Sequence, residues 1–109
     1  MAVDGLGNIY ALGTFNSAIL KFGPDGKFLD MFGSGGEGPG TLDSPQAIAV
    51  DGQGRIYVSE LVGPIKIFDS GGQYLDSITI QALGMRFNDR GDLFVAARTR
   101  VLKYEINLP

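Results

Sequence analysis

The chain of 109 residues contains no cysteine, no histidine and no tryptophan. Without cysteine it has no disulfide, no thiolate metal site and no cysteine nucleophile. Without histidine it lacks the commonest general base and the commonest side-chain ligand of transition metals. No apolar run approaches the roughly 18 residues that a membrane-spanning helix needs. These absences favour a non-enzymatic protein over an enzyme without deciding between them, because Asp, Glu and Asn remain available for chemistry. We expect no cofactor, no metal and no membrane partner.

Positive charge is also scarce. The chain has 9 Lys and Arg residues against 12 Asp and Glu residues, for a net charge of −3. Nucleic acids and anionic membranes both favour clustered Lys and Arg. The composition therefore predicts no nucleic-acid partner, and it leaves the compartment open.

Glycine, by contrast, is abundant, with 17 residues, and apolar residues make up 44% of the chain. The apolar share suits one packed domain and argues against disorder. An excess of glycine without a collagen period is typical of many tight turns between short strands.

The chain repeats itself. Residues 2–10 read AVDGLGNIY and residues 49–57 read AVDGQGRIY, so seven of nine positions are identical at an offset of 47. A self-match at such a period is the mark of a repeat architecture, in which each copy forms one supersecondary unit.

The match extends beyond this segment. Residues 19–30 align with residues 65–76, and a third, more divergent copy aligns Gly91 with Gly54, only 37 positions later. The shorter offset arises mostly because a loop equivalent to residues 33–44 is missing before the third copy.

Each copy divides into short runs rich in β-forming residues, separated by Gly-containing turns. No segment shows a 3.6-residue period over three turns, so we expect no helix. An antiparallel unit of four strands that repeats every ~40–45 residues is typical of a β-propeller blade. The expected strands are 1–4, 8–12, 18–22, 27–32, 46–50, 55–59, 64–68, 73–79, 83–88, 92–96 and 100–105.

The predicted fold is therefore all-β, with four-stranded antiparallel blades in an incomplete ring. Residues 1–109 form one segment, with a first blade at 1–32, a second at 46–79 and a partial third at 83–105. Such an arc exposes apolar blade faces, which monomers rarely show. Two arcs could join into one ring, or further blades could complete it.

One stretch resembles a known family. Residues 31–51 read MFGSGGEGPGTLDSPQAIAVD, and an Ile-Tyr-Val run follows at 56–58. This segment resembles the NHL repeat, with its Phe-Gly, Gly-rich loop, Pro, inner strand of small residues ending in Asp, and following Ile-Tyr-Val. The resemblance implies half of a six-bladed propeller that binds proteins or, in some animal members, RNA.

The chain departs from that family at its polar positions. Glu60 stands where the family often has Asp, while Gly63 and Pro64 lie where Asn and Arg are usual. In the third copy Ala97 replaces the acid, although Arg100 keeps the basic position. We therefore expect the polar contacts that join NHL blades to be mostly absent.

Asp4, Asp51 and Asn88 share one repeat position, and each opens a Gly-containing turn. Asp and Asn favour such turns because their side chains bond to the backbone two residues later. A Ca²⁺ site needs 6–8 converging oxygens. We therefore interpret these residues as turn formers and not as ligands.

Candidate binding residues lie in loops and in the third copy. The arginines of that copy, with Lys103 beyond them, form either solvated strand faces or a basic patch for an anionic ligand. Apolar residues between second and third strands either tuck into the core or line a binding face. With the acidic Glu60, the candidate set is Phe15, Glu60, Leu61, Val62, Arg86, Arg98 and Arg100.

The most consistent hypothesis is a non-catalytic scaffold that binds a protein, a ligand or a second copy of itself. One alternative is a fragment of a six-bladed enzyme of the lactonase or lyase type, with a metal at the channel mouth. A second alternative is an RNA-binding NHL module, which the net charge disfavours.

Overall fold

The computed structural model describes residues 1–13, 17–33, 41–61 and 63–106. In this part of the chain eleven β-strands form and there is no helix. The strands are β1 (Ala2–Val3), β2 (Ile9–Gly13), β3 (Ala18–Phe22), β4 (Phe28–Phe32), β5 (Pro45–Val50), β6 (Ile56–Glu60), β7 (Ile65–Phe68), β8 (Tyr74–Ile78), β9 (Gly84–Phe87), β10 (Leu93–Ala96) and β11 (Val101–Tyr104).

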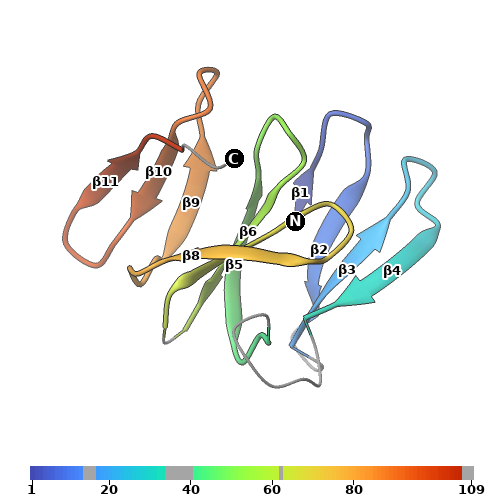
Figure 1. Ribbon diagram of the computed structural model, residues 1–109, viewed down its shortest axis with the longest axis horizontal. Helices are drawn as coiled ribbons and strands as arrows, with labels where there is room; N and C mark the ends of the chain where they lie inside the picture. The colour runs from blue at the N-terminus through green and yellow to red at the C-terminus, as the bar shows by residue number, and fades with distance from the viewer. Residues whose placement is uncertain (14–16, 34–40, 62, 107–109) are drawn as a thin grey trace.

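The strands form three antiparallel sheets (Figure 1). Sheet 1 has the order β1-β2-β3-β4, sheet 2 the order β5-β6-β7-β8, and sheet 3 the order β9-β10-β11. The predicted all-β class is thereby confirmed, with three or four strands in each sheet. The arrangement of these sheets as propeller blades stays a prediction.

Sheet 2 lies between the other two, because its residues alternate between two cores. Ile56 and Val58 of β6 pack with Tyr10 and Ile19 of sheet 1. Tyr57, which lies between them in sequence, packs instead with sheet 3, and its ring meets Phe87 edge-on at 4.9 Å. Both faces of sheet 2 are therefore buried, as the period of two in a strand requires.

The first hairpin of each sheet is closed by a side chain. Asp4 Oδ1 accepts the backbone N–H groups of Leu6 and Asn8, each at 2.9 Å. Asp51 and Asn88 make the same two bonds at their own turns. The prediction that this repeat position forms turns is confirmed.

A second bond supports each of these turns, between the side chain at the Asp4 position and the side chain four residues later. Asn8 Nδ2 donates to Asp4 Oδ2 at 3.0 Å, and Arg55 Nε donates to Asp51 Oδ2 at 2.6 Å. In the third copy the roles reverse, because the amide of Asn88 donates to the Asp92 carboxylate at 3.2 Å.

Sheets 1 and 2 share an irregularity between their third and fourth strands. The register shifts between Lys21 and Phe22 in sheet 1 and between Ile67 and Phe68 in sheet 2. A bulge of this kind changes which face the following residues occupy. In sheet 1 it leaves Phe28 opposite Phe22 on one face and Phe32 opposite Ile19 on the other.

Candidate functional site

Three connections come together at one end of sheets 2 and 3. They are Leu61 and residues 63–64 of the β6–β7 loop, the β8–β9 connection at 79–83 and the β10–β11 loop at 97–100 (Figure 1). Hydrogen bonds tie them to one another: Gln81 Nε2 donates to the Leu61 carbonyl. Leu83 N donates to Ala96 O at 2.8 Å. We call this surface the loop face.

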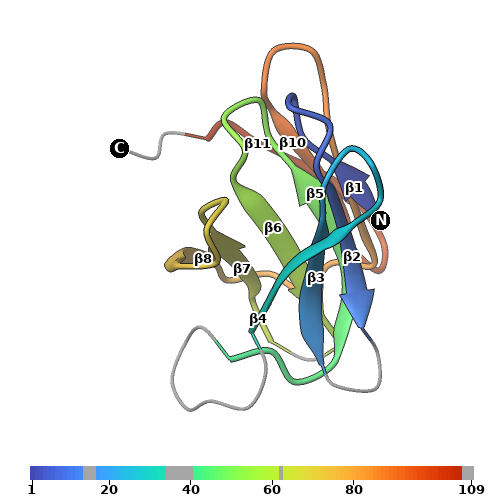
Figure 2. The ribbon, with the colours of Figure 1, turned by 90° about the vertical axis from the view of Figure 1, so that its right-hand side faces the viewer.

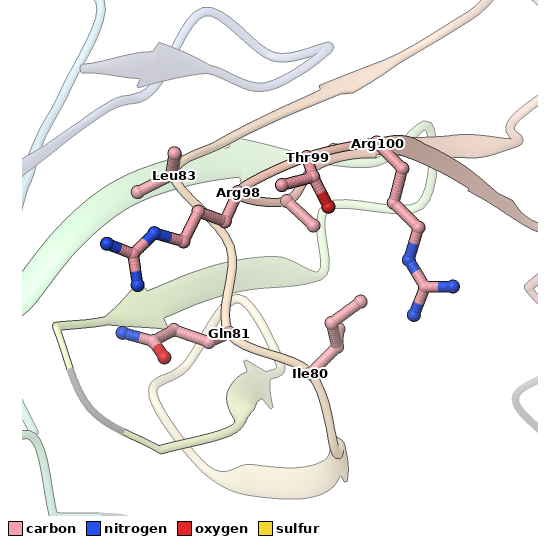
Figure 3. Close-up of a pocket in the computed structure, with 7 residues that line it drawn as sticks. Ile80, Gln81, Leu83, Arg98, Thr99 and Arg100 are labelled. Atoms are coloured by element: carbon pink, nitrogen blue, oxygen red, sulfur yellow. The ribbon is translucent and has the colours of Figure 1, made fainter.

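A pocket of about 540 Å³ opens on the loop face. It lies between the β8–β9 connection and the β10–β11 loop, and Figure 3 shows its lining side chains. Arg98 extends toward the side of Gln81 and Leu83, and Arg100 extends to the other side, with Ile80 between them. The lining residues are Ile80, Gln81, Leu83, Ala97, Arg98, Thr99 and Arg100.

The charge of this pocket is positive. Arg98 and Arg100 are both exposed, and neither forms an ion pair with any residue that the structure describes. The Ala97 N–H donates to the Arg100 carbonyl at 2.9 Å, which closes the loop that carries both guanidinium groups. The loop therefore presents two cationic groups on opposite sides of one pocket, and a guanidinium fork matches a carboxylate in bidentate geometry.

Apolar side chains border the same surface. Leu83 is 68% exposed and Leu61 is 54% exposed. A smaller pocket of about 50 Å³ joins these two residues, with Gln46, Glu60, Gln81 and Ala82 around it. The loop face therefore offers apolar contacts beside the cationic pocket.

Arg86 does not belong to this site. It lies in β9 opposite Phe94, on the face of sheet 3 that also carries Lys103, and it does not line the pocket. The predicted cluster of three arginines is thus divided: the structure brings Arg98 and Arg100 together and places Arg86 on a sheet face. Phe15 and Val62, the other predicted loop residues, lie outside the described residues.

Glu60 has a different role from the predicted one. It is 2% exposed, and its carboxylate accepts the N–H of Asp43 at 3.1 Å and that of Ser44 at 2.7 Å. The Lys66 ammonium lies 3.5 Å from the same carboxylate and also donates to the Thr41 carbonyl. Glu60 and Lys66 therefore anchor the connector between sheets 1 and 2.

This anchor corrects one expectation from the sequence. We expected the polar contacts between neighbouring repeats to be mostly absent, and that expectation is wrong at the second copy. Glu60 accepts hydrogen bonds from two backbone amides and lies beside Lys66, so its carboxylate already has partners within the fold.

Five residues of the pocket were not among the predicted site residues: Ala97 and Thr99, which flank Arg98, and three residues from another segment. Those three, Ile80, Gln81 and Leu83, belong to the short connection between sheets 2 and 3, and Leu83 falls at the start of an expected strand. The only signal in the sequence was a leucine two residues after a glutamine, in a connection that has no glycine-rich loop. Its exposure depends on where the β10–β11 loop lies, and the local sequence does not show this.

Within the described residues no group of three or more Asp or Glu side chains is placed to hold a metal ion. The same part of the chain has no helix that is long and apolar enough to cross a membrane.

No family model and no curated protein matches the chain. Among solved structures, a protein of unknown function from Bacteroides caccae is similar, with a TM-score of 0.57 and 15% sequence identity. The match covers 97% of this chain and 44% of that one, so the chain spans less than half the length of its structural relative. At this identity the likeness concerns the fold alone. Membership of the NHL family, and the assignment of residues 1–109 to one NHL-type segment, stay predictions.

Proposed function

We propose that this chain is a non-catalytic segment of an NHL-type β-propeller of the six-bladed kind, and that it acts as a scaffold for binding a protein. Three repeated sheets packed in a row support the scaffold. The observation that carries the proposal is the pocket of about 540 Å³ with two guanidinium groups that form no ion pair within the described part of the chain. Other blades or a second copy complete the ring.

The chemistry of the loop face defines the kind of partner. Arg98 and Arg100 suit carboxylates, and the exposed Leu61 and Leu83 suit apolar side chains. Arginine is enriched among the residues that carry most of the binding energy in protein interfaces, and the leucines add apolar contact area beside it. The partner that fits is a peptide segment in which acidic and apolar residues stand side by side.

The buried carboxylates support a scaffold over an enzyme. Asp51 is 7% exposed and bonds to Arg55, Tyr57 and its own turn, while Glu60 holds the connector. A general acid or base must reach a substrate proton. Both side chains are already committed to the fold. No contact among the residues that the structure describes favours the lactonase-type or RNA-binding alternatives.

Selection from a random 12-residue peptide library on phage tests the proposal. We expect the enriched peptides to be acidic with interspersed apolar residues. Their Kd, measured as synthetic peptides by fluorescence anisotropy, should rise at least tenfold in the Arg98→Glu/Arg100→Glu variant. Two charge reversals of that kind replace attraction by repulsion at close range.

The matched control reverses two cationic charges elsewhere, in Lys27→Glu/Arg90→Glu. Both residues are exposed in hairpin turns away from the pocket. This variant should bind the same peptides as the parent chain. Equal losses in both double variants, or a selection without acidic enrichment, would overturn the proposed binding site.

A further inference from the structure

One face of sheet 1 is apolar and uncovered. Cross-strand pairing places its residues in a row, from Val3 to Ile9 to Phe22 to Phe28. Phe28 is 60% exposed and Val3 is 58% exposed, and the rings of Phe22 and Phe28 meet edge-on at 5.9 Å. Figure 2 looks onto this side of the molecule, with the strands of sheet 1 nearest the viewer. We call it the outer face of sheet 1; it consists of Val3, Ile9, Ala11, Leu20, Phe22 and Phe28.

The second copy of the repeat shows how the equivalent face is covered by a neighbouring sheet. Val50, Ile56, Val58, Phe68 and Tyr74 of sheet 2 occupy the same repeat positions as Val3, Ile9, Ala11, Phe22 and Phe28 of sheet 1. In sheet 2 this set is covered, because it packs against the inner face of sheet 1. The outer face of sheet 1 is therefore a copy of a surface that another sheet buries within the same molecule.

The covering surface also has a counterpart. Sheet 1 covers sheet 2 with a face that carries Tyr10, Ile19 and Lys21. The equivalent positions of sheet 3 are Phe94, Val101 and Lys103, respectively. Cross-strand pairing places Phe94 beside Lys103, on the face of sheet 3 that packs against no other sheet in the described chain. Val101 is 69% exposed there. We call this the outer face of sheet 3.

Lys21 shows how the two kinds of face recognise each other. Its ammonium lies 5.6 Å from the centroid of the Tyr10 ring and donates to the Ser70 carbonyl of sheet 2 at 2.9 Å. In the alignment of residues 19–30 with 65–76, Pro24 takes the place of Ser70. Lys103 is half exposed and lies 3.6 Å from Asp92, so it can turn toward a carbonyl on a facing sheet. A surface ion pair of this length holds it only weakly.

From this equivalence we infer that two copies of the chain pair, each laying the outer face of its sheet 3 on the outer face of sheet 1 of the other. In this arrangement Lys103 of one copy donates to the Pro24 carbonyl of the second copy, as Lys21 does to Ser70 within one chain. The occupant is a second copy because the chain itself carries both complementary faces. The inference rests on the proposed propeller, in which a ring of six sheets takes two copies of three.

Sedimentation equilibrium from 1 to 100 μM tests the pairing. The expected mass is twice the 11.6 kDa of the chain. Phe28→Asp on sheet 1 and Val101→Asp on sheet 3 should each raise the dimer Kd at least tenfold, since both residues are exposed and outside the two cores. Leu75→Asp is the matched control: it is 44% exposed on β8, away from both faces, and should leave the dimer intact.

Cross-linking tests the register. The chain has no cysteine, so Pro24→Cys/Lys103→Cys introduces the only two thiols. A short bis-maleimide reagent should join them between copies and give a covalent dimer. Lys21→Cys/Ser70→Cys is the positive control, because it places the same contact inside one chain and should give a cross-linked monomer.

Each other outcome overturns the inference. A monomer throughout this concentration range would contradict the pairing. A trimer or an open polymer would contradict a ring closed by two copies. A dimer whose Kd does not change in either aspartate variant would place the interface elsewhere. A monomer that still binds acidic peptides through Arg98 and Arg100 keeps the proposed function, because only the pairing has failed. A dimer that binds no such peptide keeps the pairing and removes the proposed peptide site.

Discussion

Sheets 1 and 2 are two copies of one repeat, nearly identical at residues 2–10 and 49–57, yet they differ in burial. Ile56 of sheet 2 is 0% exposed, whereas the equivalent Ile9 of sheet 1 is partly exposed. Asp51 is buried and the equivalent Asp4 is less so. The residues are the same, so the difference comes from the neighbours: sheet 2 has a sheet on both sides and sheet 1 has one. In a stacked repeat, position in the stack decides how much each contact stabilises.

The largest expected effect tests this difference in burial directly. Ile56→Ala should lower the free energy of unfolding by about 2–5 kcal/mol, because it leaves a cavity in a closed core. Ile9→Ala should lower the free energy of unfolding by less than half of this amount. It is measured in the Phe28→Asp variant, in which the outer face of sheet 1 stays open to water. Urea denaturation of both variants measures the difference, and equal costs would contradict the burial of sheet 2.

The connector anchor gives the next effect. Glu60→Gln should lower the free energy of unfolding by about 2–3 kcal/mol, since it weakens bonds to buried amides and leaves Lys66 without its counter-charge. The matched change is Ala97→Glu, which puts an acid at the equivalent position of the third copy. The connection before that copy is short and lacks the loop that Glu60 anchors, so thermal melting should show a change within about 0.5 kcal/mol. A stabilising Ala97→Glu would mean that the acid acts without the connector.

Alkaline pH separates the first two copies from the third. Burial and the Asp4 carboxylate raise the pKa of Tyr10 to about 12, and burial and Asp51 likewise raise that of Tyr57. The third copy has Phe94 at this position. The pKa of Tyr10 in the folded chain exceeds its unfolded value of 10.0. The protonated tyrosine therefore contributes stability below pH 10, and this contribution is lost as the pH rises from 10 toward 12.

The Tyr10→Phe/Tyr57→Phe variant should flatten this pH dependence. Urea midpoints at pH 9, 10, 11 and 12 measure it, with the parent chain as reference. A variant that loses stability as steeply as the parent would show that other groups control the alkaline transition.

The smallest expected effect concerns Ser59. Its hydroxyl is fully buried and is the one buried side-chain polar atom without a partner among the described residues. The equivalent positions in the other copies are Leu12 and Ala96, both apolar. Ser59→Ala should therefore raise the free energy of unfolding by up to about 1 kcal/mol. A calorimetric melting temperature below that of the parent would reveal a partner for the hydroxyl.

The sequence predicted features that depend on neighbouring residues. The strands and the turns at Asp4, Asp51 and Asn88 follow from alternation and side-chain-to-backbone bonds within four residues. The division into three sheets followed from the repeat, which carries the same local pattern three times.

Features that depend on distant segments were not predictable in this way. The role of Glu60 depends on the path of a connector 16 and 17 residues away. Arg86 and Arg98 are close in sequence, but a strand and a turn place them on different surfaces. The loop-face pocket needs Gln81 and Leu83 beside the β10–β11 loop, and that juxtaposition comes from sheet packing.

The turn bonds have a consequence for acid conditions. Burial alone would raise the pKa of Asp4, but hydrogen bonds from Asn8, Leu6 and Tyr10 outweigh burial and hold that pKa below its usual value. The carboxylate therefore supports the turn until the pH falls through this lowered pKa. In the third copy the acceptor of both backbone bonds is the amide oxygen of Asn88, which does not titrate in this range. The first and third hairpins therefore respond differently to acid, although they have the same shape. Opening of the chain at low pH should begin at its N-terminal hairpin.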